Sequence, residues 1–513
     1  MLPRRGLFAL GSATLVAALA PAPAAAAPRR YPFTLGVASG DPLPDGVILW
    51  TRLAPSPFEP MGGLTYASHR VSWQLARDDR FRTVIRSGTA TATAEYGHSV
   101  HVDVRGLEPG REYWYRFRTG GHVSATGRTR TMPAQGSSPG RLRFAAASCQ
   151  AYQDGWFTAY RHLAAEDLDL VFFLGDYIYE GAITPDGGNR FDTSLRLPDT
   201  YTLASDTLDL YRMRYALYHT DPDLQAAHAA FPWVVTWDDH EVQDNYAAGV
   251  SRYPVDPVDF LVHRANAYRA YWENLPLRLP QLPAGPDALL YRRLRYGDLA
   301  TAHVLDTRQY RSDQACGDNL RAGCAARDDA GRTILGRAQR DWLLDGMSDS
   351  GTHWNLIAQQ VMMAECHYGG PAARMDMDKW DGYAADRRAV LLHAGRVPGT
   401  VVLTGDIHFN YAADLRVDFA RPGTPAVGVE LVCTSISSGG DGSESTPNLE
   451  QQLAFNPHLR FANAQRGYVR AELTRERLRA DYRVVPYVTR LDAPILTRAS
   501  FVTERTRPGL VHT

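Results

Sequence analysis

The sequence predicts a chain of the α+β class, in which an antiparallel β-domain is followed by an α/β region. Residues 31–132 contain short segments that alternate apolar and polar residues between Gly, Pro and Asp turns, as strands with one buried face do. From residue 142 onward, continuous apolar runs are separated by segments with helical spacing, which is typical of strands buried on both faces of a sheet. With 513 residues, the chain is long enough for two or three such units.

The first 27 residues predict an export signal. A basic start is followed by an apolar stretch over residues 7–20 and by small residues suited to cleavage at 22–27. Arg4 and Arg5, with Leu7 and Phe8 behind them, resemble a twin-arginine signal, although Pro3 replaces the usual Ser or Thr; a general secretory signal is the alternative. No later stretch is apolar for 18 residues, so we expect a secreted, extracellular protein without an integral membrane segment.

The net charge limits the expected binding partners, and the cysteine content bears on the expected disulfides. The 55 basic and 56 acidic residues give a net charge of −1, which offers no general attraction to nucleic acid. The five cysteines are an odd number for an exported chain. Cys316 and Cys324 flank the short loop "CGDNLRAGC" and are the expected disulfide, with Cys366 and Cys433 as a second candidate pair. Cys149 is then unpaired.

The β-domain is expected to contain strands at residues 46–53, 70–76, 99–107 and 112–120. The segment "GLEPGREYWYRF" resembles a fibronectin type III or related sandwich, in which a tyrosine closes the corner before a late strand. Residues 133–141 form a Pro, Gly and Ser linker. This linker contains Gly136-x-Ser138-x-Gly140, but a nucleophile elbow needs a strand before it and a helix after it, so we interpret the match as coincidence.

The α/β region is expected to extend from residue 142 to 490. Buried strands are predicted at residues 141–150, 168–176, 231–241, 354–360, 400–408 and 429–440. Helices are predicted at residues 154–167, 260–275, 335–347 and 384–396. Residues 467–485 alternate with period two and suggest an antiparallel hairpin. The polar and aromatic segment 185–225 suggests a lid or excursion, and residues 491–513 suggest a C-terminal tail.

Chemically active side chains follow four of the predicted strands. They are Cys149, Asp176, the run Asp238-Asp239-His240 with Asn245 shortly after it, and Asp406 with His408. Each has an ordinary interpretation on its own, because an Asp after a strand is most often a turn or cap residue and a Cys there is most often a small buried side chain. Ligands bind beyond the carboxyl ends of strands in open α/β sheets. These residue types together therefore predict a metal site at one sheet edge.

The segments "GDYIYE", "WDDHEVQDNY" and "GDIH" resemble calcineurin-like metallophosphoesterases, and more closely the alkaline phosphatase D (PhoD-like) family. The resemblance extends through "ASCQ", "DTRQYR", "DKWDGYAADR" and "SISSGG", and the β-domain is similar to the N-terminal domain of that family. The resemblance implies an N-terminal β-sandwich followed by two mixed β-sheets flanked by helices.

The resemblance also implies a set of ligands. Fe³⁺ would be held by four side chains and Ca²⁺ by oxygen ligands, with Asp176 shared between them as a bridge. The implied ferric ligands are Cys149, Asp176, Tyr179 and His408. The implied calcium ligands are Asp176, Asp238, Asn245 and Asp406, with the choice among Asp238, Asp239 and His240 open. Thiolate and phenolate suit ferric iron, and all-oxygen ligands suit calcium.

Catalytic roles are expected for three residues. Asp176 would bridge the cations, His240 would orient the phosphate or protonate the leaving group, and Arg264 would grip the phosphate unless it is a surface ion-pair residue.

We therefore expect a secreted, monomeric phosphoesterase that hydrolyses phosphomonoesters and phosphodiesters through a metal-activated hydroxide. The alternative is a calcium-stimulated phospholipase D that uses the same metal site, with Trp156, Tyr201, Tyr211 and Tyr215 either at an interfacial mouth or in ordinary packing. The usual phospholipase D mechanism needs two His-x-Lys sites and is excluded by the single lysine, Lys379. A non-enzymatic, degenerate phosphate-binding protein is the third possibility, and it predicts gaps in the ligand set, of which there are none.

Overall fold

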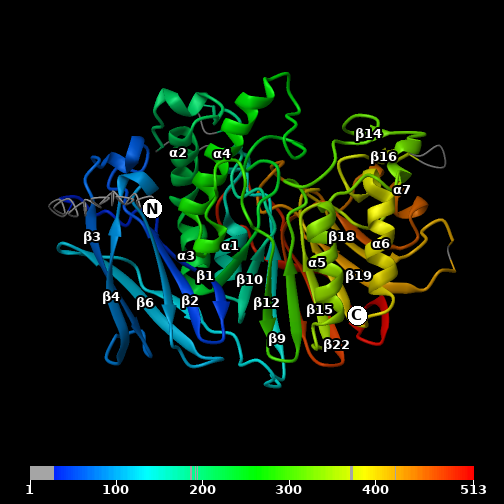
Figure 1. Ribbon diagram of the computed structural model, residues 1–513, viewed down its shortest axis with the longest axis horizontal. Coiled ribbons are helices and arrows are strands. Elements are labelled where there is room, and N and C mark those ends of the chain that lie inside the picture. The colour runs from blue at the N-terminus through cyan, green and yellow to red at the C-terminus, as the bar shows by residue number, and fades with distance from the viewer. Residues whose placement is uncertain (1–27, 185–187, 191, 193–194, 370–373, 422) are drawn as a thin grey trace, which may run out of the picture.

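Two large β-sheets stacked face to face form the centre of the molecule. The computed structural model describes residues 28–184, 188–190, 192, 195–369, 374–421 and 423–513, and Figure 1 shows their arrangement. The predicted export signal lies outside the described residues. The predicted class, an N-terminal β-sandwich followed by an α/β unit with two mixed sheets and flanking helices, is confirmed.

The larger sheet has ten strands. Its central strands are parallel to one another, and antiparallel strands extend it on both sides. In spatial order the strands are β24 (Arg507–His512), β23 (Leu496–Glu504), β22 (Arg477–Val485), β21 (Arg466–Leu473), β9 (Leu142–Ala147), β10 (Leu170–Phe173), β11 (Pro232–Val235), β1 (Val37–Leu43), β2 (Gly46–Arg52) and β5 (Ser99–Arg105).

The second sheet has seven strands, of which β13, β15, β17 and β19 run parallel. In spatial order they are β12 (Arg292–Tyr296), β13 (Ala300–Val304), β15 (Trp354–Ala358), β17 (Thr400–Thr404), β19 (Ala426–Val432), β18 (Asn410–Arg416) and β20 (Leu459–Asn463). Every buried strand predicted for the α/β region is thus present, and so is the hairpin, as β21 and β22.

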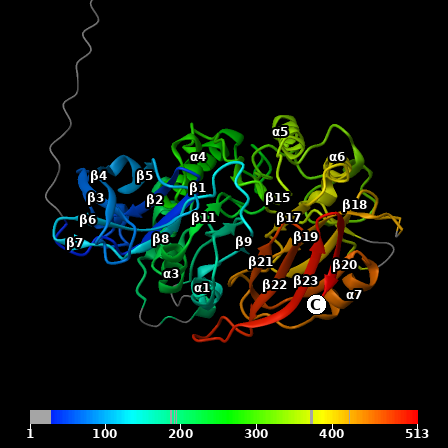
Figure 2. The ribbon, with the colours of Figure 1, turned by 90° about the horizontal axis from the view of Figure 1, so that it is seen from below.

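The core between the two sheets is apolar and fully buried, with Phe144, Phe172, Leu356 and Leu403 among its side chains. Helices cover the outer face of each sheet, because the opposite face of every central strand is apolar too. Figure 2 places α1, α3 and α4 to one side of the stacked sheets and α6 and α7 to the other. The helices are α1 (Thr158–Ala164), α2 (Leu208–His219), α3 (Pro222–Ala230) and α4 (Pro257–Asn274) over the ten-stranded sheet, and α5 (Gly336–Ser348), α6 (Ala384–Ala394) and α7 (Pro447–Phe455) over the other.

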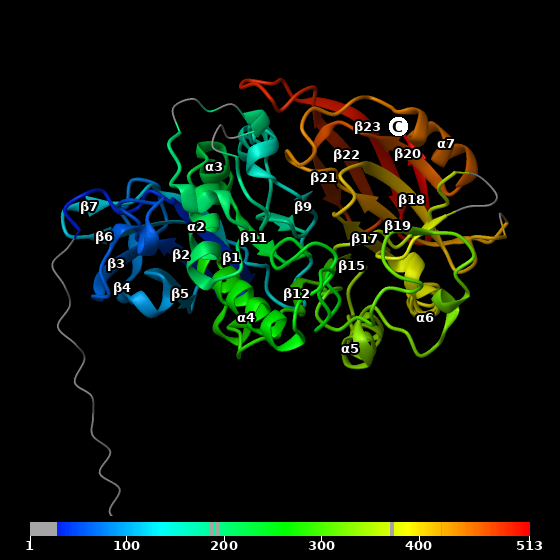
Figure 3. The same ribbon diagram turned by 90° about the horizontal axis from the view of Figure 1, so that it is seen from above.

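The N-terminal sandwich shares one of its two layers with the ten-stranded sheet. The separate layer, at the left in Figure 3, consists of β4 (Val84–Ala92), β3 (His69–Ala76), β6 (Glu112–Thr119) and β7 (His122–Val123), with β8 (Gly127–Arg130) beside β6. It packs on Val47 and Leu49 of β2, and β1 continues into the larger sheet by pairing with β11. The predicted corner is present, since the Glu108 N–H donates to the Tyr113 hydroxyl at 3.0 Å.

Two segments differ from their predictions. Residues 491–513, expected as a tail, supply β23 and β24, and their Phe501 and Leu510 lie in the core between the sheets. The described part of segment 185–225, expected as a lid, includes α2, whose Tyr211 and Tyr215 are fully buried. Both segments have charged residues between the apolar ones, so the sequence pattern did not reveal that one face of each segment is buried.

The expected disulfide between Cys316 and Cys324 is present. The second candidate pair is wrong: all five cysteines are described, and Cys366 and Cys433 are free. They lie in different cores, with Cys366 among the side chains outside the seven-stranded sheet and Cys433 between the sheets. Among the described residues, no helix has the length and apolar character needed to cross a membrane.

Buried histidines away from the candidate site predict acid lability. Burial lowers the pKa of His219 to about 3 and the pKa of His303 and His458 to about 4. Between pH 6.5 and 4 the unfolded chain therefore binds protons that the folded protein does not. The free energy of unfolding decreases as the pH is lowered, by up to about 1.4 kcal/mol per pH unit for each histidine. We expect the urea midpoint of EDTA-treated protein to drop across this range, and to drop less steeply in His303→Gln. Equal pH dependence in the two proteins would contradict this account.

Candidate metal centre

The predicted ligands come together because both sheets end at the same place. Cys149, Asp176 and Asp238 follow β9, β10 and β11 of the ten-stranded sheet, and Asp406 and His408 follow β17 of the other. A bridge between Ser148 and Ser435 joins the ends of the two sheets. The carboxyl ends of parallel strands thus deliver the side chains to one position, but from two sheets rather than from the one sheet edge that the strand pattern predicts.

The backbone is left-handed at five predicted ligands, which is uncommon for residues other than glycine. Their φ angles lie between 50° and 64°, and the residues are Cys149, Asp176, Asn245, Asp406 and His408. Such conformations carry a free-energy cost and persist where the surroundings hold them, most often at functional sites. Gly175, with φ of 111°, shows how closely the chain is packed here: a Cβ at this position would lie 2.4 Å from the Cβ of Asp238.

One cluster of ligand atoms matches the predicted ferric set. The ligand atoms of Cys149, Asp176 and His408 all lie within 4.8 Å of one another. The Tyr179 hydroxyl donates to Asp176 Oδ2 at 2.9 Å and lies 2.9 Å from His408 Nε2. A thiol, a carboxylate, a phenol and an imidazole therefore converge on one point, and this donor set fits ferric iron.

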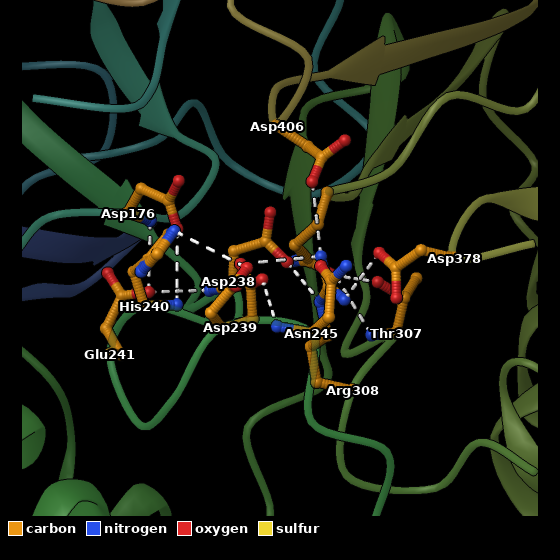
Figure 4. Close-up of polar contacts among 12 residues, drawn as sticks. Asp176, Asp238, Asp239, His240, Glu241, Asn245, Thr307, Arg308, Asp378 and Asp406 are labelled. Carbon is orange, nitrogen blue, oxygen red and sulfur yellow. Dashed lines mark hydrogen bonds and ion pairs between the residues drawn. The ribbon is translucent and has the colours of Figure 1, made fainter. Parts of the chain in front are cut away.

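Two further clusters share residues with the first. Asp176, Asp239 and His240 form the second, and Asp238, Asp239 and Asp406 form the third. The Asn245 N–H donates to Asp239 Oδ2 at 2.7 Å, which places Asn245 beside the third cluster, as Figure 4 shows. Carboxylate-rich sets of this kind fit calcium. Within the run 238–240, all three residues belong to a cluster, and Asp239 belongs to two.

The electrostatics of the clusters favour a bound cation. Burial raises the pKa of Asp176 and Asp238 well above the usual range, and it raises the pKa of Asp406 to about 6, because these carboxyl groups share a water-poor space with one another. Asp238 is fully buried, and its Oδ2 has no hydrogen-bond partner in the described part of the chain. A buried acceptor without a donor is costly, and a cation would satisfy it.

Arg308 lies at the centre of the acidic residues and was missed by the sequence analysis. Its guanidinium is fully buried and donates to Asp238, to Asp378 Oδ2 at 2.8 Å and to Asp406 Oδ1 at 3.2 Å, and it lies 3.4 Å from Asp239 Oδ1 (Figure 4). The sequence signal for Arg308 is its place just after β13, an apolar run that is absent from the predicted strands.

Lys379 adds a second positive charge, since its Nζ lies 3.6 Å from Asp406 Oδ2 and 3.4 Å from Asp376 Oδ2. The cationic side chains of Arg308 and Lys379 thus offset part of the charge of the acidic clusters without any metal ion.

Buried Glu241 and half-buried Glu180 hold the loops of the site, and neither was predicted. Glu241 accepts the N–H groups of Asp176 at 3.0 Å and of Asp238 at 2.7 Å. Glu180 Oε2 contacts His240 Nδ1 at 2.8 Å, and the ring of Tyr179 lies 4.2 Å from the His240 ring. Although burial works in the opposite direction, the charges of Glu180 and Asp176 raise the pKa of His240 well above its usual value. These charges favour the protonated form of His240.

Arg264, predicted to contact phosphate, lies elsewhere. It is a buried residue of α4 that donates to the Ala248 carbonyl at 2.6 Å and to Asp287 Oδ1 at 3.1 Å. Across the described ranges, no hydrogen bond or ion pair joins it to the three clusters.

The four aromatic residues considered for an interfacial mouth show mainly packing roles. Tyr201, Tyr211 and Tyr215 are at most 3% exposed, and all three belong to the core on the helix side of the ten-stranded sheet. Trp156 is half-buried and stacks under the Arg190 guanidinium, 4.4 Å from its ring centre.

Two stacked sheets with buried carboxylate, imidazole, thiol and phenol ligands at their strand ends define the class of site that metal-dependent hydrolases use. Comparisons with known proteins agree. Residues 144–482 match the PhoD-like phosphatase family, and residues 18–133 match the PhoD-like phosphatase N-terminal domain. The chain belongs to the PhoD-like phosphatase family.

Individual relatives support the same assignment. The chain is 48% identical over 484 residues to alkaline phosphatase D of Bacillus subtilis (strain 168), which covers 94% of this chain and 82% of that protein. The solved structure of PhoD matches with a TM-score of 0.91 and 46% identity, over 95% of this chain and 93% of that one.

Proposed function

We propose that the protein is a metal-dependent phosphoesterase that hydrolyses phosphomonoesters and phosphodiesters with Fe³⁺ and Ca²⁺. The observation that carries this proposal is the overlap of three ligand clusters through Asp176 and Asp239, with the buried Oδ2 of Asp238 left unpartnered. Shared carboxylates suit neighbouring cations that act on one phosphoryl group. The similarity to alkaline phosphatase D supports the phosphoester substrate class.

Each side chain has a role that follows from its contacts. When bound, the cations would supply charge stabilisation at the phosphoryl oxygens and acidify an attacking water. Cys149, Tyr179 and His408 would hold the ferric ion, Asp238, Asp239, Asn245 and Asp406 would hold the calcium, and Asp176 would be shared between the two. Glu180 holds Nδ1 of His240, so Nε2 is the nitrogen that donates a proton to the leaving oxygen.

The export signal predicted over residues 1–27 supports secretion, and we propose the twin-arginine route because Arg4 and Arg5 precede its apolar stretch. Cleavage of phospholipids by the same site remains the alternative substrate class, and the burial of Tyr201, Tyr211 and Tyr215 does not favour it. Activity on p-nitrophenyl phosphate, bis-p-nitrophenyl phosphate and phosphatidylcholine separates the classes. Hydrolysis of phosphatidylcholine alone would replace the proposed substrate class with the lipid class.

Colour provides a direct test of the ferric site. A phenolate or thiolate bound to Fe³⁺ gives a visible charge-transfer band, so we expect the purified protein to be coloured and the band to be lost in Cys149→Ala and shifted or lost in Tyr179→Phe. Tyr177→Phe is the matched control, because the Tyr177 hydroxyl contacts His228 in the helix-side core rather than the cluster. A colourless, iron-free protein with full activity would disprove the iron assignment.

A further inference from the structure

The disulfide-closed loop of residues 316–324 reaches the candidate metal centre through one carboxylate. Asn245 Nδ2 donates to both Oδ1 and Oδ2 of Asp318, at 3.0 Å each. Arg252 Nε lies 3.3 Å from Asp318 Oδ2 and holds this carboxylate from another side. Asp318 is the residue of the loop that contacts a predicted calcium ligand, and its side chain is only 16% exposed.

These contacts determine which atom of the Asn245 amide is available to a cation. A carboxylate only accepts hydrogen bonds, so the amide nitrogen must face Asp318 and the amide oxygen must point away from it. The backbone of Asn245 is held as well, since its N–H donates to Asp239 Oδ2 at 2.7 Å and its carbonyl accepts from Gln314 Nε2 at 2.7 Å. An oriented amide oxygen beside a carboxylate is the ligand that calcium prefers.

The conformation of the loop that carries Asp318 depends on the disulfide that closes it. The backbone is left-handed at Cys316 (φ 56°) and Asn319 (φ 74°), a conformation that costs free energy in residues other than glycine. Besides the disulfide, the loop is held by the two-residue pairing of β14 (Leu320–Arg321) with β16 (Met375–Asp376), visible at the upper right of Figure 1. Opening the disulfide would release the loop into many conformations and leave Asp318 unplaced.

We infer that Asp318 is a positioning residue for the Asn245 amide, and that the Cys316–Cys324 disulfide thereby sets the calcium affinity of the site. This inference rests on the proposed function. It means that the chain binds calcium weakly while its cysteines are reduced and gains full affinity once the disulfide has formed, as it does in an oxidising compartment.

The test is the Kd for Ca²⁺, measured by isothermal titration on iron-loaded protein. We expect Asp318→Ala to raise this Kd about 10- to 100-fold, the usual effect of losing a partner that orients a metal ligand. Asp318→Asn keeps one acceptor oxygen and is expected to have an intermediate effect. The double variant Cys316→Ser with Cys324→Ser, which avoids adding a reductant to ferric iron, is expected to raise the Kd as well.

The matched control is Asp328→Ala, an exposed carboxylate just beyond the closed loop, whose Kd is expected to stay within about twofold of the wild type. An unchanged iron absorption band shows that each variant is folded. A wild-type Kd in both Asp318→Ala and Asp318→Asn overturns the inference and leaves the proposed function intact. A wild-type protein that binds no Ca²⁺ overturns both.

A double-mutant cycle distinguishes positioning from simple charge attraction. If Asp318 acts through Asn245, Asp318→Ala has little further effect in an Asn245→Ala background. If Asp318 instead attracted Ca²⁺ through space, Asp318→Ala would lower the Ca²⁺ affinity equally in both backgrounds. This loss of affinity would shrink between 0.05 and 0.5 M salt. Full additivity with that salt dependence overturns the positioning role.

Discussion

Asp176→Asn is expected to remove both iron and calcium from the protein and to lower kcat/KM for bis-p-nitrophenyl phosphate by more than about 100-fold. Asp176 belongs to two ligand clusters, accepts the Tyr179 hydroxyl at 2.9 Å and follows β10 in a left-handed conformation. Even partners that only orient metal ligands typically contribute 10- to 100-fold, so a shared ligand is expected to contribute more. Bound metals are counted by elemental analysis, and rates are measured on the same preparation.

Asp414→Asn is the matched control for this substitution. Asp414 is also a buried aspartate, but it lies within β18, pairs with Arg460 at 2.6 Å and accepts the Leu510 N–H, outside the clusters. We expect it to lower stability and leave the metal content unchanged. Full iron and calcium in Asp176→Asn would contradict the bridging role.

Arg308→Met is expected to destabilise the metal-free protein by about 3–5 kcal/mol, the usual effect of removing one partner from a buried ion pair. Arg308 is fully buried, and its loss leaves Asp238, Asp239, Asp378 and Asp406 without their common counter-charge. Calcium is expected to restore much of this stability because it supplies positive charge to the same carboxylates. The measurement compares urea midpoints in EDTA and in CaCl₂.

Arg264→Met provides the control, because Arg264 is a buried arginine whose side-chain partners, Asp287 and the Ala248 carbonyl, belong to none of the three clusters. It is expected to destabilise the protein equally in EDTA and in CaCl₂. The role assigned to Arg308 is wrong if its variant shows no larger response to calcium than the Arg264 variant.

Strand ends were the part of the site that local sequence patterns predicted well. Apolar runs that stop at Cys149, Asp176, Asp238 and Asp406 mark buried parallel strands, and parallel strands of one sheet end at a common edge. Asp406 arrives from the second sheet, which the strand pattern alone did not show. The short loop between Cys316 and Cys324 likewise limited the disulfide to a local pairing, which the structure confirms. The signals were strong because each involves neighbouring residues.

Other parts depended on pairings between distant residues. The alternation in residues 46–53 predicts a strand, but it does not show that the preceding β1 lies against β11 and joins the N-terminal sandwich to the larger sheet. Charged residues in segment 491–513 suggested a tail, although its alternate side chains complete the core between the sheets. Whether an alternating segment is a tail or an outer strand depends on which edge is available to it.

The sequence by itself therefore determined the fold class, the candidate ligand types and their positions after buried strands. Only the tertiary structure decided how these charges are balanced: it placed Arg308, distant in sequence, among four aspartates, and it set Asp318 against Asn245. The physical reason is that a buried carboxylate must find a partner wherever the folded chain supplies one, and that partner need not be near in sequence.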